Sequence, residues 1–175
     1  MRRHHAQHGL TLVEAAAVLG ITVAAATIAA PGLQRLIDLR RLDASATQLA
    51  ADLQLARNES IARNRPVRLS WHATSSCYMV HTGAATQCSC ASDGAGRCDA
   101  DAVLLRSVGW TAADRVALQS NTASIAFDPL HGTASPAATW RVIGSDGRAV
   151  HHIVNVMGRV RSCSPLGAVA GHRAC

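Results

Sequence analysis

The sequence predicts an α+β protein in which one long N-terminal helix packs on a head that consists of an antiparallel β-sheet. The first observation is an apolar run of 21 residues from Leu10 to Ala30. The second is a helical spacing of apolar residues between Leu42 and Ser60. The third is a series of short Val-, Ile- and Leu-rich segments after Val67, separated by Gly, Asp and Ser clusters. Outside the apolar run, the chain has room for one small globular domain.

The run from Leu10 to Ala30 is long enough to cross a membrane. At about 1.5 Å per residue, its helix spans the roughly 30 Å hydrocarbon core of a bilayer. Glu14 is its only charged residue, and an unpaired carboxylate in hydrocarbon costs on the order of a few kcal/mol, which suggests a function for it. A secretory signal cleaved near Ala24 to Ala26 is the alternative, but the run exceeds the roughly 7 to 15 apolar residues of such a signal.

The helix is expected to continue beyond the apolar run into the head. Pro31 lacks a backbone N–H and is expected to kink the helix without ending it, since helical spacing resumes afterwards. The helix is expected to end near Asn64, because Pro66 disfavours a helical conformation at the residue before it. Its apolar positions are Leu42, Ala46, Leu49, Leu53, Ala56 and Ser60, with the charged residues Arg40, Arg41, Asp43, Asp52, Arg57 and Glu59 between them.

The sequence after the helix predicts short strands joined by turns. Ser145-Asp146-Gly147 and Met157-Gly158 are hairpin turn signals, so the last strands are expected to form a meander. Residues 82–102 lack periodicity and are expected to form a long loop held by disulfides. The predicted strands are Val67 to Trp71, Tyr78 to His81, Val103 to Val108, Val116 to Leu118, Ser124 to Phe127, Thr139 to Ile143, Ala149 to Asn155 and Arg159 to Cys163.

Six cysteines in so small a head indicate disulfides formed in an oxidising compartment. A zinc site with His72 or His81 is the alternative, but no common zinc spacing occurs, and we expect neither a metal nor another cofactor. The expected pairs are Cys163 with Cys175, which closes a short C-terminal loop, and then Cys77 with Cys88 and Cys90 with Cys98.

The C-terminal part of the chain is basic. From residue 141 onward it contains five arginines and one acid, Asp146. Within it, Gly158-Arg159-Val160-Arg161 places two arginines two apart on a predicted strand, where they share a face and can contact adjacent phosphates. A solvated strand without a ligand is the alternative. The sequence contains no nucleophile elbow, HExxH motif, P-loop or GxGxxG, so we expect no enzymatic activity.

The N-terminus resembles the class III leader of type IV prepilins in Gly9, the segment Leu10-Thr11-Leu12-Val13-Glu14, and Pro31. The resemblance implies that prepilin peptidase removes a leader of residues 1–9 by cutting between Gly9 and Leu10 and methylates the new amino terminus. It also implies that Glu14 neutralises the terminal amine of a neighbouring subunit during filament assembly. Many members of the family have phenylalanine where this chain has Leu10, which puts the efficiency of methylation in question.

Two further segments, residues 51–69 and the later Gly-Arg-Val-Arg-Ser-Cys, resemble the GspH/FimT family of minor pilins and pseudopilins. The resemblance implies a chain made of a transmembrane helix (10–30), an amphipathic helix (31–64) and a β-rich head (65–175). It implies a single-pass protein of the bacterial inner membrane with a periplasmic head, which then enters a pilus or pseudopilus filament together with other pilins.

The same resemblance implies one of two functions. A FimT-like minor pilin helps to assemble or prime the type IV pilus and binds DNA non-specifically for natural transformation, whereas a GspH-like pseudopilin of type II secretion has a purely structural role. In the first case the DNA-binding positions are Gly158, Arg159 and Arg161, with Arg148 and Arg173 as basic neighbours. A secreted enzyme or inhibitor whose anchor is removed by signal peptidase is a third possibility.

Overall fold

The computed structural model describes residues 11–91, 94–99 and 101–175. The leader of residues 1–9 and the predicted cleavage pair, Gly9 and Leu10, lie outside the described residues. The chain divides into two compact units, residues 1–37 and residues 38–175. The second unit is called the head below.

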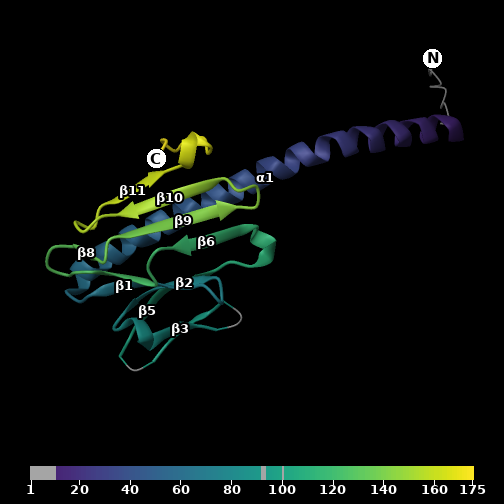
Figure 1. The fold of residues 1–175 in the computed structure, drawn as a ribbon. Helices are drawn as coiled ribbons and strands as arrows, with labels where there is room; N and C mark the ends of the chain where they lie inside the picture. Colours follow the sequence, from purple (N-terminus) through teal and green to yellow (C-terminus); the bar gives the residue numbers. More distant parts are fainter. Residues whose placement is uncertain (1–10, 92–93, 100) are drawn as a thin grey trace, which may run out of the picture. The chain divides into compact units, whose positions relative to one another are not determined.

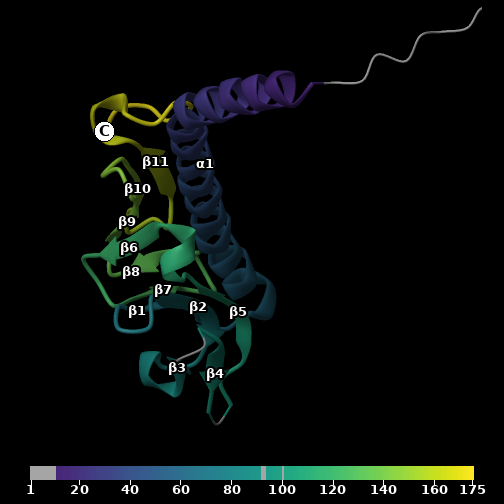
Figure 2. The same cartoon turned by 90° about the vertical axis from the view of Figure 1, so that its right-hand side faces the viewer.

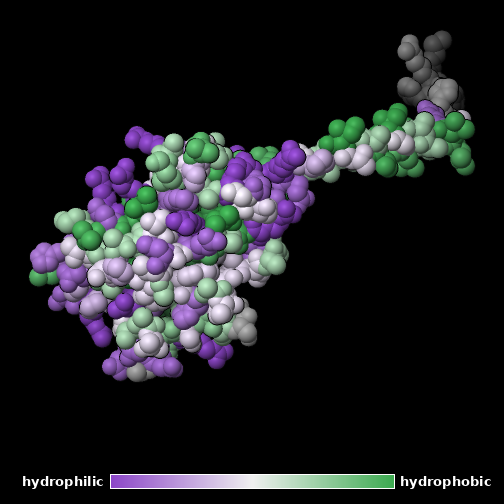
Figure 3. Space-filling model, in the orientation of Figure 1, coloured by the Kyte–Doolittle hydropathy of each residue, from purple (hydrophilic) through white to green (hydrophobic). Residues whose placement is uncertain are grey.

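Helix α1 extends over 52 residues, Leu12–Arg63, and continues through Pro31. Up to Ile37 its described residues are exposed and mostly apolar, as the surface in Figure 3 shows. By length and composition, α1 contains one segment able to cross a membrane. The helix ends where the sequence predicted, because Asn64 takes a left-handed conformation with φ of 49° and Arg65 donates its N–H to the Ser60 carbonyl oxygen at 3.2 Å.

Within the head, α1 buries the stripe that its spacing predicted. Leu42, Ala46, Leu49, Leu53, Ala56 and Ser60 are all buried. Asp38 and Asp52 are buried with them. The sequence interpretation of Asp52 as one of the charged residues between the apolar positions was therefore wrong. Its spacing from Leu49 and Ala56 places it on the stripe, and hydrogen bonds from the sheet compensate its burial.

The first sheet of the head has five antiparallel strands in the order β5-β2-β1-β7-β8. Its centre is the β1–β2 hairpin, in which Leu69 lies opposite Val80. Figure 1 shows its β1, β2 and β5 beside one another. The strands are β1 (Val67–His72), β2 (Cys77–Thr82), β5 (Leu104–Gly109), β7 (Ser124–Phe127) and β8 (Ala134–Ser135).

The second sheet has four antiparallel strands in the order β11-β10-β9-β6. Both predicted hairpin turns join its strands, and their glycines have positive φ, 82° at Gly147 and 70° at Gly158. In Figure 1 this sheet lies along the part of α1 that belongs to the head. The strands are β6 (Val116–Ser120), β9 (Ala138–Gly144), β10 (Ala149–Val154) and β11 (Val160–Cys163).

The segment that was predicted to be a long loop contains regular structure. After the 3-10 helix η1 (Ala85–Gln87), β3 (Cys88–Cys90) and β4 (Gly96–Cys98) form a two-stranded sheet, visible beside one another in Figure 2. The prediction failed because strands of three residues are too short to show a period. The two-residue strand β8 escaped prediction for the same reason.

The cysteines pair as Cys77–Cys90, Cys88–Cys98 and Cys163–Cys175. The expected C-terminal pair is present, whereas the predicted pairs Cys77–Cys88 and Cys90–Cys98 are wrong. The β3–β4 register explains the difference, because it places Cys88 directly opposite Cys98 and Cys90 opposite Gly96. Cys90 is then free to reach Cys77 at the start of β2.

The hydrophobic core belongs to the head alone. Every buried apolar side chain among the described residues lies between Leu42 and Val169. The largest are Trp140, Tyr78 and Phe127. Because the head contains its own core and all three disulfides, we expect residues 38–175 to fold without the preceding part of α1.

Candidate nucleic-acid interface

The β10–β11 turn fixes the backbone at Arg159, the first of the two arginines. Gly158 donates its N–H to the Asn155 carbonyl oxygen at 2.9 Å, and Arg159 donates its N–H to Asn155 Oδ1 at 2.9 Å. The left-handed φ of Gly158 closes this turn with little strain, because glycine has no Cβ. Asn155 and Gly158 therefore determine where Arg159 leaves the turn.

Gly158 is required for a second reason. A Cβ atom at this position would lie 2.0 Å from the Gly132 carbonyl oxygen. The turn is tied to the same loop by a hydrogen bond from the Ala134 N–H to the Val156 carbonyl oxygen at 2.9 Å. Gly158 is buried, so it positions the arginines that follow it and offers no side chain to a ligand.

Arg159 and Arg161 are both exposed. Val160 between them packs against the core, and Ser162 hydrogen-bonds His152 Nδ1 at 2.8 Å. Among the described residues, neither guanidinium has a hydrogen-bond or ion-pair partner. The two side chains line different hollows, of about 210 Å³ for Arg159 and about 370 Å³ for Arg161. They are available to an anionic ligand.

Arg173 lines the same hollow as Arg161, together with the Cys163–Cys175 disulfide. Its backbone carbonyl oxygen accepts the Ser164 N–H at 2.8 Å, so the tail is held beside the end of β11. Arg148 differs, because its Nε donates to Asp146 Oδ2 at 2.6 Å. The Arg148 guanidinium lowers the pKa of Asp146, and the ion pair makes Arg148 the least available of the predicted DNA-binding arginines.

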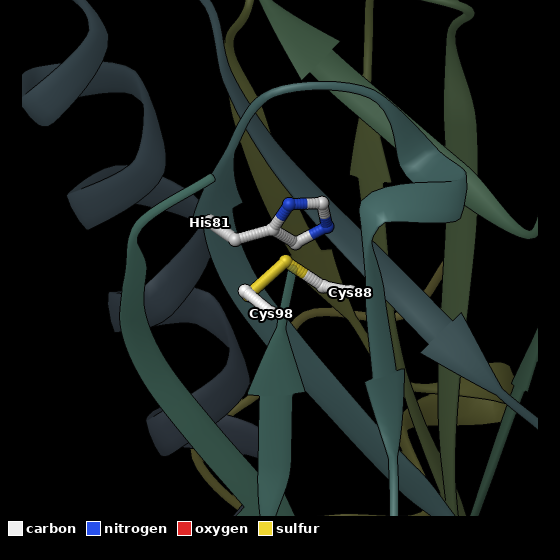
Figure 4. Close-up of side chains that lie close together, drawn as sticks. All are labelled: His81, Cys88 and Cys98. Carbon is white, nitrogen blue, oxygen red and sulfur yellow. A yellow bond between two sulfur atoms is a disulfide. The ribbon is translucent and has the colours of Figure 1, made fainter. Parts of the chain in front are cut away.

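One further group of side chains has metal-ligand chemistry. Ligand atoms of His81, Cys88 and Cys98 lie within 4.8 Å of one another, as Figure 4 shows. The two cysteines form a disulfide, His81 Nδ1 lies 2.9 Å from the Thr82 carbonyl oxygen, and its Nε2 lies 2.9 Å from Ser70 Oγ. Burial lowers the pKa of His81. With both ring nitrogens hydrogen-bonded and both sulfurs oxidised, this cluster is suited to a disulfide core and not to an ion.

Sequence analysis missed a buried polar network. Asp52 Oδ2 accepts the Tyr78 hydroxyl at 2.7 Å and a Gln48 N–H at 3.0 Å, and Arg106 Nε lies 3.1 Å from Asp52 Oδ1. Burial and the Asp52 hydrogen bond raise the pKa of Tyr78, so its hydroxyl stays a donor. The network joins α1 to β2 and β5 and has a structural role. Its only sequence signal was an acid on the apolar stripe of the helix.

A long helix with an apolar N-terminal part, followed by a head of antiparallel sheets with disulfides, defines the pilin-like class of fold. The family model described as "Type II transport protein GspH" matches residues 45–158. Because the match covers more than half of the chain, the chain belongs to the GspH family.

Two crystal forms of one minor pilin support the fold. The type IV minor pilin FimU of Pseudomonas aeruginosa PAO1 matches in a P21 crystal form with a TM-score of 0.55 and 18% identity, over 72% of this chain and 93% of that chain. A P65 crystal form of the same protein matches with a TM-score of 0.52 and 18% identity, over 70% of this chain and 96% of that chain. The minor pseudopilin EpsH of the Vibrio cholerae type 2 secretion system matches with a TM-score of 0.48 and 10% identity, over 71% of this chain and 98% of that chain. No curated protein sequence gives a match.

Proposed function

We propose that this chain is a FimT-like minor pilin, which takes part in assembling or priming a type IV pilus and binds DNA without sequence preference for uptake in natural transformation. The observation that carries the proposal is a pair of exposed, unpartnered arginines, Arg159 in the turn before β11 and Arg161 on β11. Arg173 extends the basic surface into the neighbouring hollow. Guanidinium groups bind phosphate through paired N–H donors, and such contacts give affinity without base readout.

The membrane part of the proposal concerns the N-terminal segment. Prepilin peptidase cuts between Gly9 and Leu10 and methylates Leu10, and the apolar helix stays with the mature protein in the inner membrane. Glu14 is exposed on α1, where it is available to the terminal amine of a neighbouring pilin during assembly. Mass spectrometry of the mature protein tests this directly. A methylated terminus at Leu10 is expected, and a terminus near residue 30 would contradict retention of the anchor.

A mobility-shift assay with the head tests DNA binding. Arg159→Ala combined with Arg161→Ala removes two guanidinium groups and is expected to abolish or strongly weaken the shift of duplex DNA. The matched control is Arg65→Ala combined with Arg97→Ala, which removes the same charge from two other exposed positions. Equal binding by the double variant and the wild-type head would refute the arginine interface.

A purely structural pseudopilin of type II secretion is the second candidate. The description of the matching family model, a type II transport protein, favours it. A structural pseudopilin does not require an unpaired Arg159 and Arg161, so the mobility-shift assay distinguishes the two candidates. Absence of DNA binding by the wild-type head, at low salt, would favour the structural role.

A further inference from the structure

A hollow of about 210 Å³ lies between α1 and the β10–β11 turn, several times the roughly 30 Å³ that one water occupies in the liquid. Its only charged lining side chains, among the described residues, are two arginines, one from α1 and one from the turn. The lining residues are Gln54, Arg57, Asn58, Gly158, Arg159 and Val160.

Arg57 is held in place at this hollow. Its Nε donates to the Gly132 carbonyl oxygen at 3.0 Å. A Cβ atom at Gly132 would lie 2.9 Å from Arg57 Nε, and one at Gly158 would lie 3.1 Å from it. The two glycines therefore leave room for the guanidinium. The side chain is half-buried, and its other N–H groups have no partner among the described residues. An arginine fixed in this way loses little freedom when it binds an anion.

Two arginines at one hollow repel each other unless an anion lies between them. Gln54 lies three residues before Arg57 and four before Asn58, so it neighbours both on the helix surface. Gln54 and Asn58 are exposed and add side-chain N–H donors to the hollow. The hollow thus offers two guanidinium groups and two amides, and no carboxylate among its described lining. This is the donor set that a phosphate group requires.

We propose that this hollow binds a phosphate of the DNA backbone, so that α1 supplies Arg57, Asn58 and Gln54 to an interface that the sequence assigned to the C-terminal strand alone. The inference rests on the DNA binding proposed above. Val160 lines this hollow, and the next residue, Arg161, lines the other. The two hollows are therefore adjacent along the chain, and the DNA backbone passes from the Arg161 hollow to the Arg57 hollow.

The test replaces the two helix amides by carboxylates of nearly the same shape, Gln54→Glu with Asn58→Asp, in the head. Both positions are exposed, so the fold is expected to be kept. Loss of one phosphate contact is expected to reduce the salt slope for duplex DNA by about 0.9 and to weaken binding roughly tenfold at 0.1 M salt. The matched control, Gln119→Glu with Asn121→Asp, makes the same chemical change at two exposed positions on and after β6 and is expected to bind as the wild type does.

A second measurement separates the outcomes. The side-chain amide signals of Gln54 and Asn58 are expected to shift in NMR spectra when a short DNA duplex or inorganic pyrophosphate is added to the wild-type head. If Arg159→Ala weakens binding while Gln54→Glu with Asn58→Asp matches its control, α1 is not part of the interface and the proposed function stands. If the wild-type head binds no DNA, both proposals are wrong.

Discussion

The two sheets of the head use their arginines in opposite ways. On the five-stranded sheet, Arg106 pairs with buried Asp52, and Arg68 donates to Ser124 Oγ at 3.3 Å. On the four-stranded sheet, Arg141 and Arg161 are exposed and have no partner among the described residues. Neither sheet has an acid within its strands, so the difference comes from α1, which presents Asp52 to one sheet. Arginines serve stability on the first sheet and are free for a ligand on the second.

The largest expected effect is on the first sheet. Asp52→Ala is expected to lower the free energy of unfolding of the head by about 4 kcal/mol, because it leaves the buried Tyr78 hydroxyl without its acceptor and Arg106 without its carboxylate. Urea denaturation measures the loss. Asp99→Ala, at an exposed position, is the control and is expected to change little. If both variants lost the same free energy of unfolding, the arginines of the first sheet would have no special role in stability.

The next effect concerns the turn that presents Arg159. Gly158→Ala is expected to cost about 3 kcal/mol, because it combines a left-handed φ with a Cβ 2.0 Å from the Gly132 carbonyl oxygen. Gly147→Ala has a similar φ but nothing within 4 Å of the added Cβ, and is expected to cost about 1 kcal/mol. Thermal unfolding of the two variants compares them. Equal costs would mean that the turn is not held against the Gly132 loop.

A third effect on stability is a pH dependence of the second sheet. Burial, with a contribution from His172, lowers the pKa of His152 to about 4. Since this pKa lies below that of the unfolded chain, near 6.5, the stabilisation is present above about pH 6.5 and is lost as the pH falls toward 4. Between pH 7 and pH 4.5 the loss is about 2 kcal/mol.

Denaturation of the head at these two pH values measures the contribution of His152. His152→Gln removes the titrating ring, so the stability of this variant is expected to depend less on pH than that of the wild type. The buried His81, whose pKa is also lowered by burial, leaves a remaining pH dependence on the first sheet. An unchanged pH dependence in His152→Gln would show that His152 does not titrate in this range.

The sequence predicted the elements whose period is long enough to read. The buried stripe of α1 and the strands around Leu69 and Trp140 show a clear apolar spacing, and the turn at Gly147 has a strong signal. The sequence could not predict β3 and β4, because three residues are too few to show a period. It therefore missed two disulfide pairs as well, since the β3–β4 register sets that pairing. The remaining omissions depend on contacts between distant parts of the chain.

In the candidate site, too, the sequence did not predict contacts between distant parts of the chain. The motif placed Arg159 and Arg161 on one strand, but only Arg161 lies on β11, and Arg159 lies in the turn before it. The space at Gly158 is set by Gly132, 26 positions earlier. Arg57 was named only as a charged residue between the apolar positions of the helix, whereas it is half-buried and hydrogen-bonded to the Gly132 carbonyl oxygen. No local pattern reports such a contact, because it forms only after the head has folded.

The most direct test is the salt dependence of duplex binding by the wild-type head and by Arg159→Ala with Arg161→Ala. Each phosphate contact contributes about 0.9 to the slope of log affinity against log salt, so the double variant is expected to have a slope smaller by about 1.8. Such a difference would show that the unpaired Arg159 and Arg161 neutralise DNA phosphates. Two parallel lines would contradict the account.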